Sequence, residues 1–289
     1  MVSVRQATNV VSLFRLWERR TRFGLLAAVS LVFGTAIWFA PRVPLGAEYH
    51  HFADHRTMLR IPNCLDVLSN IPFLIVGGWG LIWLLQKSAK ASFVRPGEKL
   101  PYFVFFAGVA LTGVGSAWYH LSPDNARLPW DLLPMACCFM SIVDTVIIER
   151  ISLKAGLWLF APLLALGIAS VAYWSYTEAQ GRGDYRFYLF VQFFSPVLVA
   201  MVMLLFPARY TRTDYLAIAF GFFLMAKLLE GFDQPIYRLA KVSGHSLKHI
   251  AAALSCYWIL RMLQQRHPIE VLPEDGVRRD SLERRDQAV

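Results

Sequence analysis

Charged side chains are scarce in this sequence. Asp, Glu, Lys and Arg make up 17% of its 289 residues, whereas 56% are hydrophobic and the mean hydropathy is +0.43. Soluble globular proteins carry roughly 25% charged residues. Several apolar runs also reach the about 20 residues that a helix needs to cross a bilayer. The composition therefore excludes an ordinary soluble domain and predicts an all-α, polytopic membrane protein.

Cysteine is also rare, and no two cysteines have C-x-x-C spacing. The chain has four, and three of them fall inside apolar runs: Cys64, Cys137, Cys138 and Cys256. This spacing excludes a thiolate zinc cluster and gives no framework for disulfides. We expect all four to be small, buried hydrophobic side chains.

Acidic residues are fewer than basic ones, 20 against 29, so the formal net charge is +9. In a soluble protein such an excess suggests a nucleic-acid partner. Here the basic residues gather in the N-terminal arm, the short loops and the C-terminal tail. That distribution instead indicates membrane topology and contact with anionic lipid, and it predicts no nucleic-acid partner.

Eight apolar runs predict eight helices. They cover residues 22–40, 65–86, 100–121, 129–148, 155–177, 187–207, 214–233 and 246–263. The first run is also compatible with a cleaved signal peptide, but it is long, starts late and lacks a clear small-residue cleavage site. No internal repeat is visible. The predicted architecture is a seven-transmembrane helix bundle plus one extra N-terminal transmembrane helix.

The basic loops predict the orientation of the chain. With the N-terminus in the cytoplasm, the positive-inside rule places these basic residues on the same side: Lys87, Lys90, Arg95, Lys99, Arg150, Lys154, Arg209 and Arg212. The predicted regions are a basic cytoplasmic arm (1–21), the extra helix (22–40), an extracytoplasmic segment (41–64), the seven-helix core (65–264) and a disordered cytoplasmic tail (265–289). Six of the seven histidines then lie near the extracytoplasmic face: His50, His51, His55, His120, His245 and His249.

Three of these histidines are candidate metal ligands. His245 and His249 are four residues apart on a predicted helix, so both imidazoles face one side and can chelate one metal ion. The alternative is that each is hydrogen-bonded at the lipid interface. His120 can supply a third nitrogen at the same depth. Three histidines with an open fourth position form a catalytic zinc arrangement, so we expect Zn²⁺.

Ser116 and Asp131 are the candidate catalytic residues. Asp131 opens a predicted helix, where the helix dipole alone favours a carboxylate. Ionisable groups at membrane depth are costly, however, and usually face a partner or a polar cavity. Asp131 can take a proton from a zinc-bound water and pass it to a leaving group. Ser116, one turn before His120, either stabilises an oxyanion or bonds back to its own helix.

Four motifs carry a resemblance to a known family: IPNCLDVLSNIPF (61–73), SAWYH (116–120), WDLLPM (130–135) and GHSLKH (244–249). Together they resemble the bacterial branch of the alkaline ceramidases. That family belongs to a seven-helix superfamily which includes adiponectin-receptor-like proteins. The resemblance runs from about Glu48 to about Leu263.

The resemblance implies a seven-helix bundle with an intramembrane zinc, set in a bacterial inner membrane. His120, His245 and His249 would be the zinc ligands, Asp131 would activate the water, and Ser116 would assist at the oxyanion. The implied reaction hydrolyses ceramide to a sphingoid base and a fatty acid.

Calcium is a further expectation from the family. Eukaryotic members bind it through an acidic D-W-x-E-x-N segment before the first core helix and a Glu on that helix. The match here is loose, with Asp54, Asn63 and Asp66 as the oxygen donors for an ion that takes six to eight. Alternatively, Asn63 and Asp66 cap the start of a helix.

Other functions fit the same sequence. One is a non-enzymatic lipid receptor or binding protein with a structural zinc, and another is a zinc hydrolase of a different lipid ester or amide. A third is an ion-coupled transporter that uses Asp144, Lys227 and Glu230, although no inverted repeat is visible. Lys227 and Glu230 are three residues apart and can instead form an ion pair, or contact substrate.

Overall fold

The computed structural model describes residues 17–269, and this part of the chain is helical, without a β-strand. The α-helices are α2 (Arg19–Phe39), α3 (Cys64–Leu68), α4 (Ile71–Leu85), α5 (Lys99–Leu121), α6 (Leu128–Arg150), α7 (Leu153–Ala179), α8 (Arg186–Leu205), α9 (Asp214–Gly231), α10 (Asp233–Ala240) and α11 (Gly244–Gln265). Three short 3₁₀ helices are η1 (Ala47–His50), η2 (Lys87–Ser92) and η3 (Pro96–Glu98). The all-α prediction is confirmed. Most of the predicted basic arm and charged tail lies outside the described residues.

Six helices are long and apolar enough to cross a membrane. They are Arg19–Phe39, Cys64–Leu85, Pro96–Leu121, Leu128–Arg150, Leu153–Ala179 and Arg186–Leu205. The bent pair α9 and α10, which meet at 80°, makes a seventh if it is counted as one span. α11 has 22 residues, about 33 Å of helix, but it carries the polar GHSLKH motif. A multi-pass membrane protein is therefore confirmed, while the count of seven core spans plus one stays a prediction.

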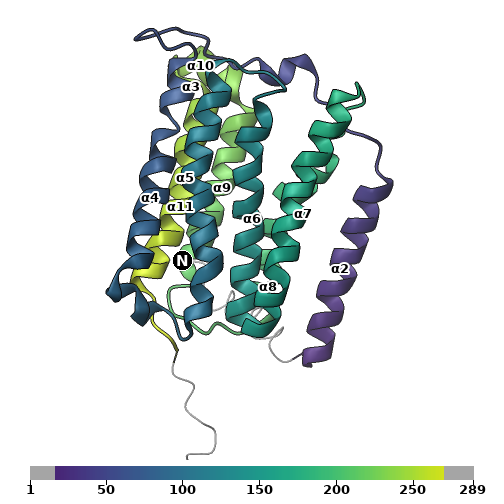
Figure 1. Ribbon diagram of the computed structural model, residues 1–289, viewed down its shortest axis with the longest axis vertical. Coiled ribbons are helices and arrows are strands. Elements are labelled where there is room, and N and C mark those ends of the chain that lie inside the picture. Colours follow the sequence, from purple (N-terminus) through teal and green to yellow (C-terminus); the bar gives the residue numbers. More distant parts are fainter. Residues whose placement is uncertain (1–16, 270–289) are drawn as a thin grey trace, which may run out of the picture.

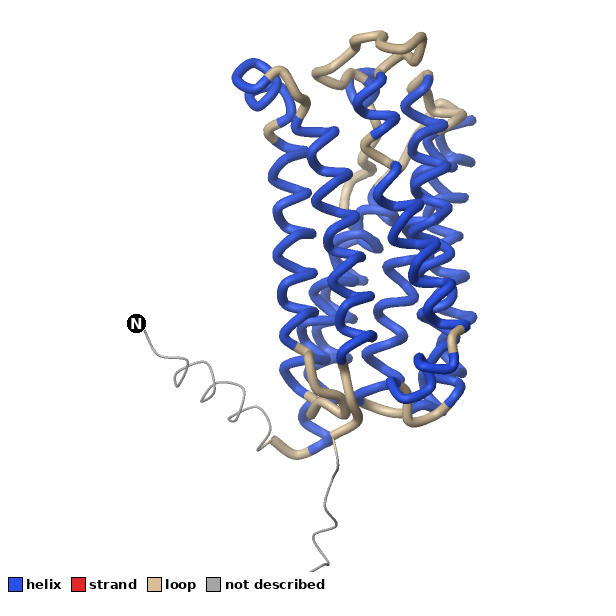
Figure 2. The backbone as a smooth tube through the Cα atoms, turned by 90° about the vertical axis from the view of Figure 1, so that its left-hand side faces the viewer, coloured by secondary structure: helices blue, strands red, loops and turns tan. Residues whose placement is uncertain are grey.

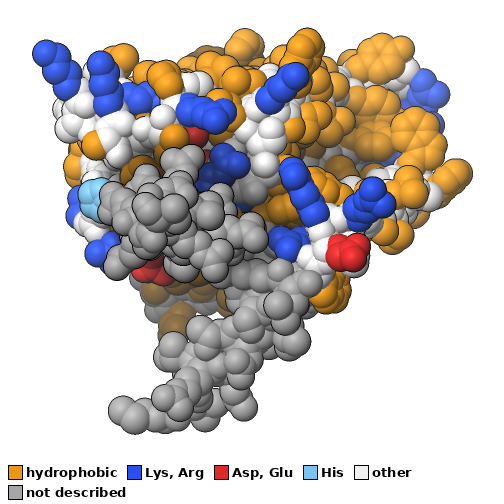
Figure 3. Space-filling view, turned by 90° about the horizontal axis from the view of Figure 1, so that it is seen from below, with side chains coloured by type: hydrophobic (Ala, Val, Ile, Leu, Met, Phe, Trp, Pro, Cys, Tyr) orange, Lys and Arg blue, Asp and Glu red, His pale blue; other side chains and the backbone are white. Residues whose placement is uncertain are grey.

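The helices run side by side along the long axis, and the loops gather at the two ends (Figures 1 and 2). One end, called here the site end, holds residues 40–63, 122–127, 180–185 and 232–243. The opposite end, called the basic end, holds residues 86–98, 151–152, 206–213 and 266–269. Lys and Arg side chains are spread over the basic end (Figure 3). The two ends therefore differ in composition as the loop charges predict.

The bundle has three clusters of buried apolar side chains, and the two largest join most of its helices. One joins α4, α5 and α11 through residues such as Phe73, Phe106 and Leu260. The other joins α6, α7 and α8 through residues such as Met140 and Trp174. Long apolar runs form helices here because neighbouring helices cover them, and small residues allow the close approach.

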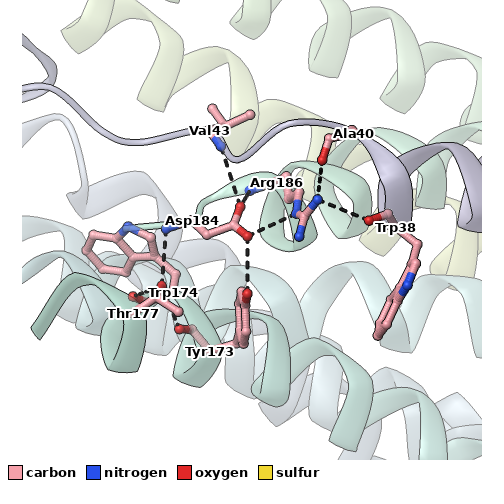
Figure 4. Close-up of polar contacts among 8 residues, drawn as sticks. All are labelled: Trp38, Ala40, Val43, Tyr173, Trp174, Thr177, Asp184 and Arg186. Carbon is pink, nitrogen blue, oxygen red and sulfur yellow. Dashed lines mark hydrogen bonds and ion pairs between the residues drawn. The ribbon is translucent and has the colours of Figure 1, made fainter. Parts of the chain in front are cut away.

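The extra helix α2 packs on one side against α8, for example through Phe33 and Phe194, whose ring centroids are 5.2 Å apart. None of its residues is buried. At the site end, Arg186 donates to the carbonyls of Trp38 (3.1 Å) and Ala40, and Asp184 pairs with Arg186 at 2.9 Å and accepts from the Val43 amide at 3.5 Å (Figure 4). This joint fixes where the chain leaves α2 and enters the segment that covers the site end.

Candidate metal centre

Three imidazoles meet inside the bundle at the site end. His120 lies in the last turn of α5, and His245 and His249 lie in the first two turns of α11. All three are buried, and their ligating nitrogens lie within 4.8 Å of one another. The structure therefore brings together the two histidine motifs that the sequence analysis selected. We call these residues the histidine triad.

The closest pair of nitrogens in the triad has the spacing expected around a transition-metal ion. The Nε2 atoms of His120 and His245 are 3.2 Å apart. Two nitrogens at 2.0–2.1 Å from a tetrahedral ion would be separated by about 3.3 Å. Imidazole suits zinc, copper, iron and nickel, and not the hard cations that prefer oxygen. The donor set therefore fits a zinc ion.

The break between α3 and α4 orients His249. Its Nδ1 lies 2.8 Å from the Ser69 hydroxyl, which itself donates to the Asp66 carbonyl at 3.1 Å. The Ser69 oxygen therefore accepts the Nδ1–H of His249, and this tautomer leaves Nε2 as the nitrogen with a free lone pair. This partner could not be predicted, because Ser69 lies 180 residues from His249 along the chain.

His120 is oriented by packing. Its Nδ1 has no hydrogen-bond partner among residues 17–269. The Phe52 ring lies 4.6 Å from the His120 ring and 4.2 Å from the His245 ring, between centroids. The Asn63 amide donates to the His120 carbonyl at 2.8 Å. The segment after η1 thus covers the triad from the site end.

The other predicted histidines of this end do not join the triad. His50 bonds the Tyr119 hydroxyl at 2.8 Å and Asn125 at 2.7 Å. His51 and His55 lie in the covering segment and are exposed. Of the six histidines placed at one face, three therefore form the candidate site.

The predicted capping role of Asn63 and Asp66 is wrong. Asn63 occupies the N-cap position of α3, but it makes no side-chain cap hydrogen bond. Asp66 accepts from the hydroxyls of Ser243 (3.0 Å) and Ser246 (2.5 Å), at the start of α11. Asp66 therefore ties α3 to the helix that carries two of the triad histidines.

Calcium gains no support from these side chains. Asp54 forms an ion pair with Arg56 at 2.6 Å, and this guanidinium holds the pKa of the Asp54 carboxyl below its usual value. Asn63 and Asp66 are engaged with α5 and α11 as described. Among the His, Cys, Asp and Glu side chains of the described chain, only the triad gathers as a metal-binding group of three.

Ser116 and Asp131 lie together where α5 meets α6. Asp131 is in the first turn of α6 and is buried. The Ser116 side chain interacts with its carboxylate, so the partner of Ser116 lies on the neighbouring helix. A Cβ added to Gly115 would lie 1.9 Å from the Trp130 carbonyl oxygen. Only glycine at 115 lets the two helices approach closely enough for this pair.

Asp233 fastens the start of α11. It lies at the bend between α9 and α10, and it accepts from the amides of His245 (3.0 Å) and Ala53 (2.9 Å). Gly244 packs so closely here that an added Cβ would lie 2.2 Å from the Leu229 carbonyl oxygen. The bend therefore joins the triad helix to the covering segment.

A cavity of about 670 Å³ runs beside the site between α5, α6, α8, α9 and α11. Asp131 and Tyr49 line it at the site end, and Leu216 and Met203 line it toward the basic end. Along α9 it extends from Leu216 to Glu230, about 21 Å. Its wall is mainly apolar. Burial raises the pKa of Tyr49 to about 12, so its phenol is a hydrogen-bond donor at neutral pH.

Besides Asp131, three charged side chains interrupt this apolar wall. Glu230 pairs with Lys227, and it accepts from Lys248 at 2.7 Å. The predicted Lys227–Glu230 ion pair is confirmed. The second ion pair, between Lys248 and Glu230, was not predicted, although Lys248 lies within the GHSLKH motif. We call Lys227, Glu230 and Lys248 the lysine cluster.

Asp144 is separate from this cavity. It is fully buried in α6, and neither of its carboxylate oxygens has a hydrogen-bond partner in the described chain. It is not among the residues that line the cavity with Lys227 and Glu230. The structure therefore does not bring together the three charged residues of the transporter hypothesis.

The arrangement combines a nitrogen-only metal site, a carboxylate paired with a hydroxyl, and a long apolar cavity with a charged band. Such groups can together bind a metal ion, transfer a proton and hold an apolar chain. No family model, curated protein or solved structure matches the chain.

Proposed function

We propose that this protein is a zinc-dependent amidase of the alkaline ceramidase type, which hydrolyses ceramide or a related N-acyl lipid within the membrane. The observation that carries the proposal is the buried histidine triad, at the same end of the bundle as a cavity-lining carboxylate. A long, mainly apolar cavity favours a lipid over a water-soluble substrate. Another lipid amide or ester fits the same cavity.

Each residue has a defined part in this reaction. His120, His245 and His249 would hold the zinc, which lowers the pKa of a bound water to about 7 and polarises a carbonyl. Asp131 lines the cavity, and it moves the proton from the water to the leaving nitrogen. Ser116 holds the Asp131 carboxylate in place and offers a hydroxyl donor to the charge that develops on the carbonyl oxygen.

The proposed topology has eight spans, both termini in the cytoplasm, and the site end facing the extracytoplasmic side of a bacterial inner membrane. The Lys and Arg side chains of the basic end support this orientation (Figure 3). The bent helices α9 and α10 and the polar helix α11 complete the count.

The direct test is release of fatty acid from ceramide by the purified full-length chain. Protein in detergent is assayed as purified, after chelation, and after zinc is restored. We expect turnover that chelation abolishes and zinc restores. A metal-loaded protein that binds ceramide and turns over no N-acyl lipid or ester would instead be a lipid-binding protein with a structural metal.

A further inference from the structure

The lysine cluster carries more positive charge than an ion pair needs. Glu230 accepts from both ammonium groups, so two cations share one anion. Each ammonium has three N–H donors. Within residues 17–269, Glu230 is the only hydrogen-bond acceptor for Lys227 and for Lys248, and this leaves donors that have no acceptor.

These N–H donors without an acceptor lie in the cavity wall. Both lysines line the cavity, and their side chains are 26% and 20% exposed. An ammonium inside the bilayer is costly unless it has a partner. Lys227 alone would neutralise Glu230, and an apolar chain needs no cation. The charge of the second lysine therefore needs another acidic group, either in the cavity wall or on a molecule that enters the cavity.

Asp131 supplies a second negative charge, since it lines the same cavity and interacts electrostatically with Lys248. Two lysines, Glu230 and Asp131 sum to zero formal charge. A divalent ion on the histidine triad would then make this end of the cavity positive by two. The metal-loaded site therefore attracts an anion more strongly than the metal-free one.

We propose that Lys227 and Lys248 form an anion-binding site inside the cavity, which holds the carboxylate head of an amphiphile while the apolar wall holds its chain. Charge-assisted hydrogen bonds to a carboxylate supply the affinity. Two sources have this chemistry: the free fatty acid, and an N-acyl amphiphile with an acidic head. The choice between them rests on the proposed hydrolysis, whereas the anion site itself does not.

The test is equilibrium binding to the full-length chain in phosphatidylcholine nanodiscs, in chelated and in zinc-loaded form. The probes are palmitate, N-palmitoylglycine and the neutral N-palmitoylethanolamine. We expect Lys248→Met and Lys227→Met to weaken anion binding by about tenfold, equivalent to 1.4 kcal/mol, and to leave the neutral amide unchanged. If the methionine variants weaken the binding of palmitate alone, the site holds the fatty acid. If they weaken the binding of both anions, the site also holds acidic substrates.

A second variant separates binding from folding. Glu230→Gln removes the competing carboxylate, so it should tighten palmitate binding, whereas a purely structural cluster predicts no gain. Lys154→Met, at an exposed position in the first turn of α7, is the matched control and should change nothing. Unchanged anion affinity in both methionine variants, or wild-type protein that binds the neutral amide as tightly as the anions, would overturn the proposal. Anion binding by chelated protein without turnover would reject the hydrolase and retain this site.

Discussion

The two ends of the bundle bury charge in different ways. Near the basic end, Arg266 is fully buried, bonds Glu149 at 2.6 Å and Tyr102 at 3.2 Å, and donates to the Ser92 carbonyl at 2.9 Å. This pair is balanced one to one and joins α5, α6 and the end of α11. The lysine cluster instead places two ammonium groups on one carboxylate, and it lines a cavity. The difference suggests that the first is a joint between helices and the second is part of a site.

The largest effect is expected at the site end. Asp131→Asn should lower the rate of amide hydrolysis by about 10²–10⁴-fold, because the proton acceptor is lost while the hydrogen-bonding shape is kept. Thermal unfolding in detergent should change little. Single-turnover release of fatty acid is the measurement. Asp144→Asn, on the same helix but away from the cavity, is the control and should keep full activity, and equal activity in both variants would remove Asp131 from the mechanism.

Removing the Arg266–Glu149 pair near the basic end should lower stability and leave the rate nearly unchanged. Arg266→Met leaves Glu149 buried without its cation, so we expect about 3–5 kcal/mol less unfolding free energy. The rate per folded molecule should stay close to that of the wild type. Denaturant unfolding and active-site titration measure the two quantities. A stable variant with a lost rate would show that the two ends are not separable in this way.

The close contact of α5 and α6 gives a smaller effect. Gly115→Ala would drive a methyl group against the Trp130 carbonyl, and we expect a loss of about 1–3 kcal/mol together with a disturbed Ser116–Asp131 pair. Gly78→Ala is the matched control, because its added Cβ meets nothing within 4 Å. Unfolding and turnover are both measured. Identical behaviour of the two variants would argue against the close approach at 115.

The smallest effect concerns the segment that covers the triad. Arg56 keeps the pKa of Asp54 below its unfolded value, so this contact stabilises the fold above about pH 4 and is lost as the pH falls through the folded pKa. Asp54→Asn should therefore lower Tm by no more than about 3 °C at pH 7 and leave no difference below the folded pKa. A difference from wild type that grows on acidification would contradict the assignment.

Much of the fold was predictable, because long apolar runs and basic loops depend on local composition. The two places where predicted helices break were not predictable. The run 65–86 divides at Ser69 and Asn70, and the run 214–233 ends at an 80° bend. At the first break Ser69 bonds His249, and at the second Asp233 accepts from the amides of His245 and Ala53. Both causes are tertiary contacts, which leave no periodic signal in the sequence.

The triad was predictable for the opposite reason. Four-residue spacing places side chains on one helical face, and shared membrane depth brings His120 to the level of His245 and His249. The role of Asp66 was missed, because its partners Ser243 and Ser246 are about 180 residues away. Lys248 was visible in the motif, but its pairing with Glu230 depends on how α9 packs against α11.

Metal content, combined with X-ray absorption at the metal edge, tests the central claim most directly. The account predicts one divalent ion per chain, with three imidazole nitrogens at about 2.0–2.1 Å, and its loss in His120→Ala and in His249→Ala. Protein without stoichiometric metal, or a His120→Ala variant that retains the ion with unchanged coordination, would contradict it.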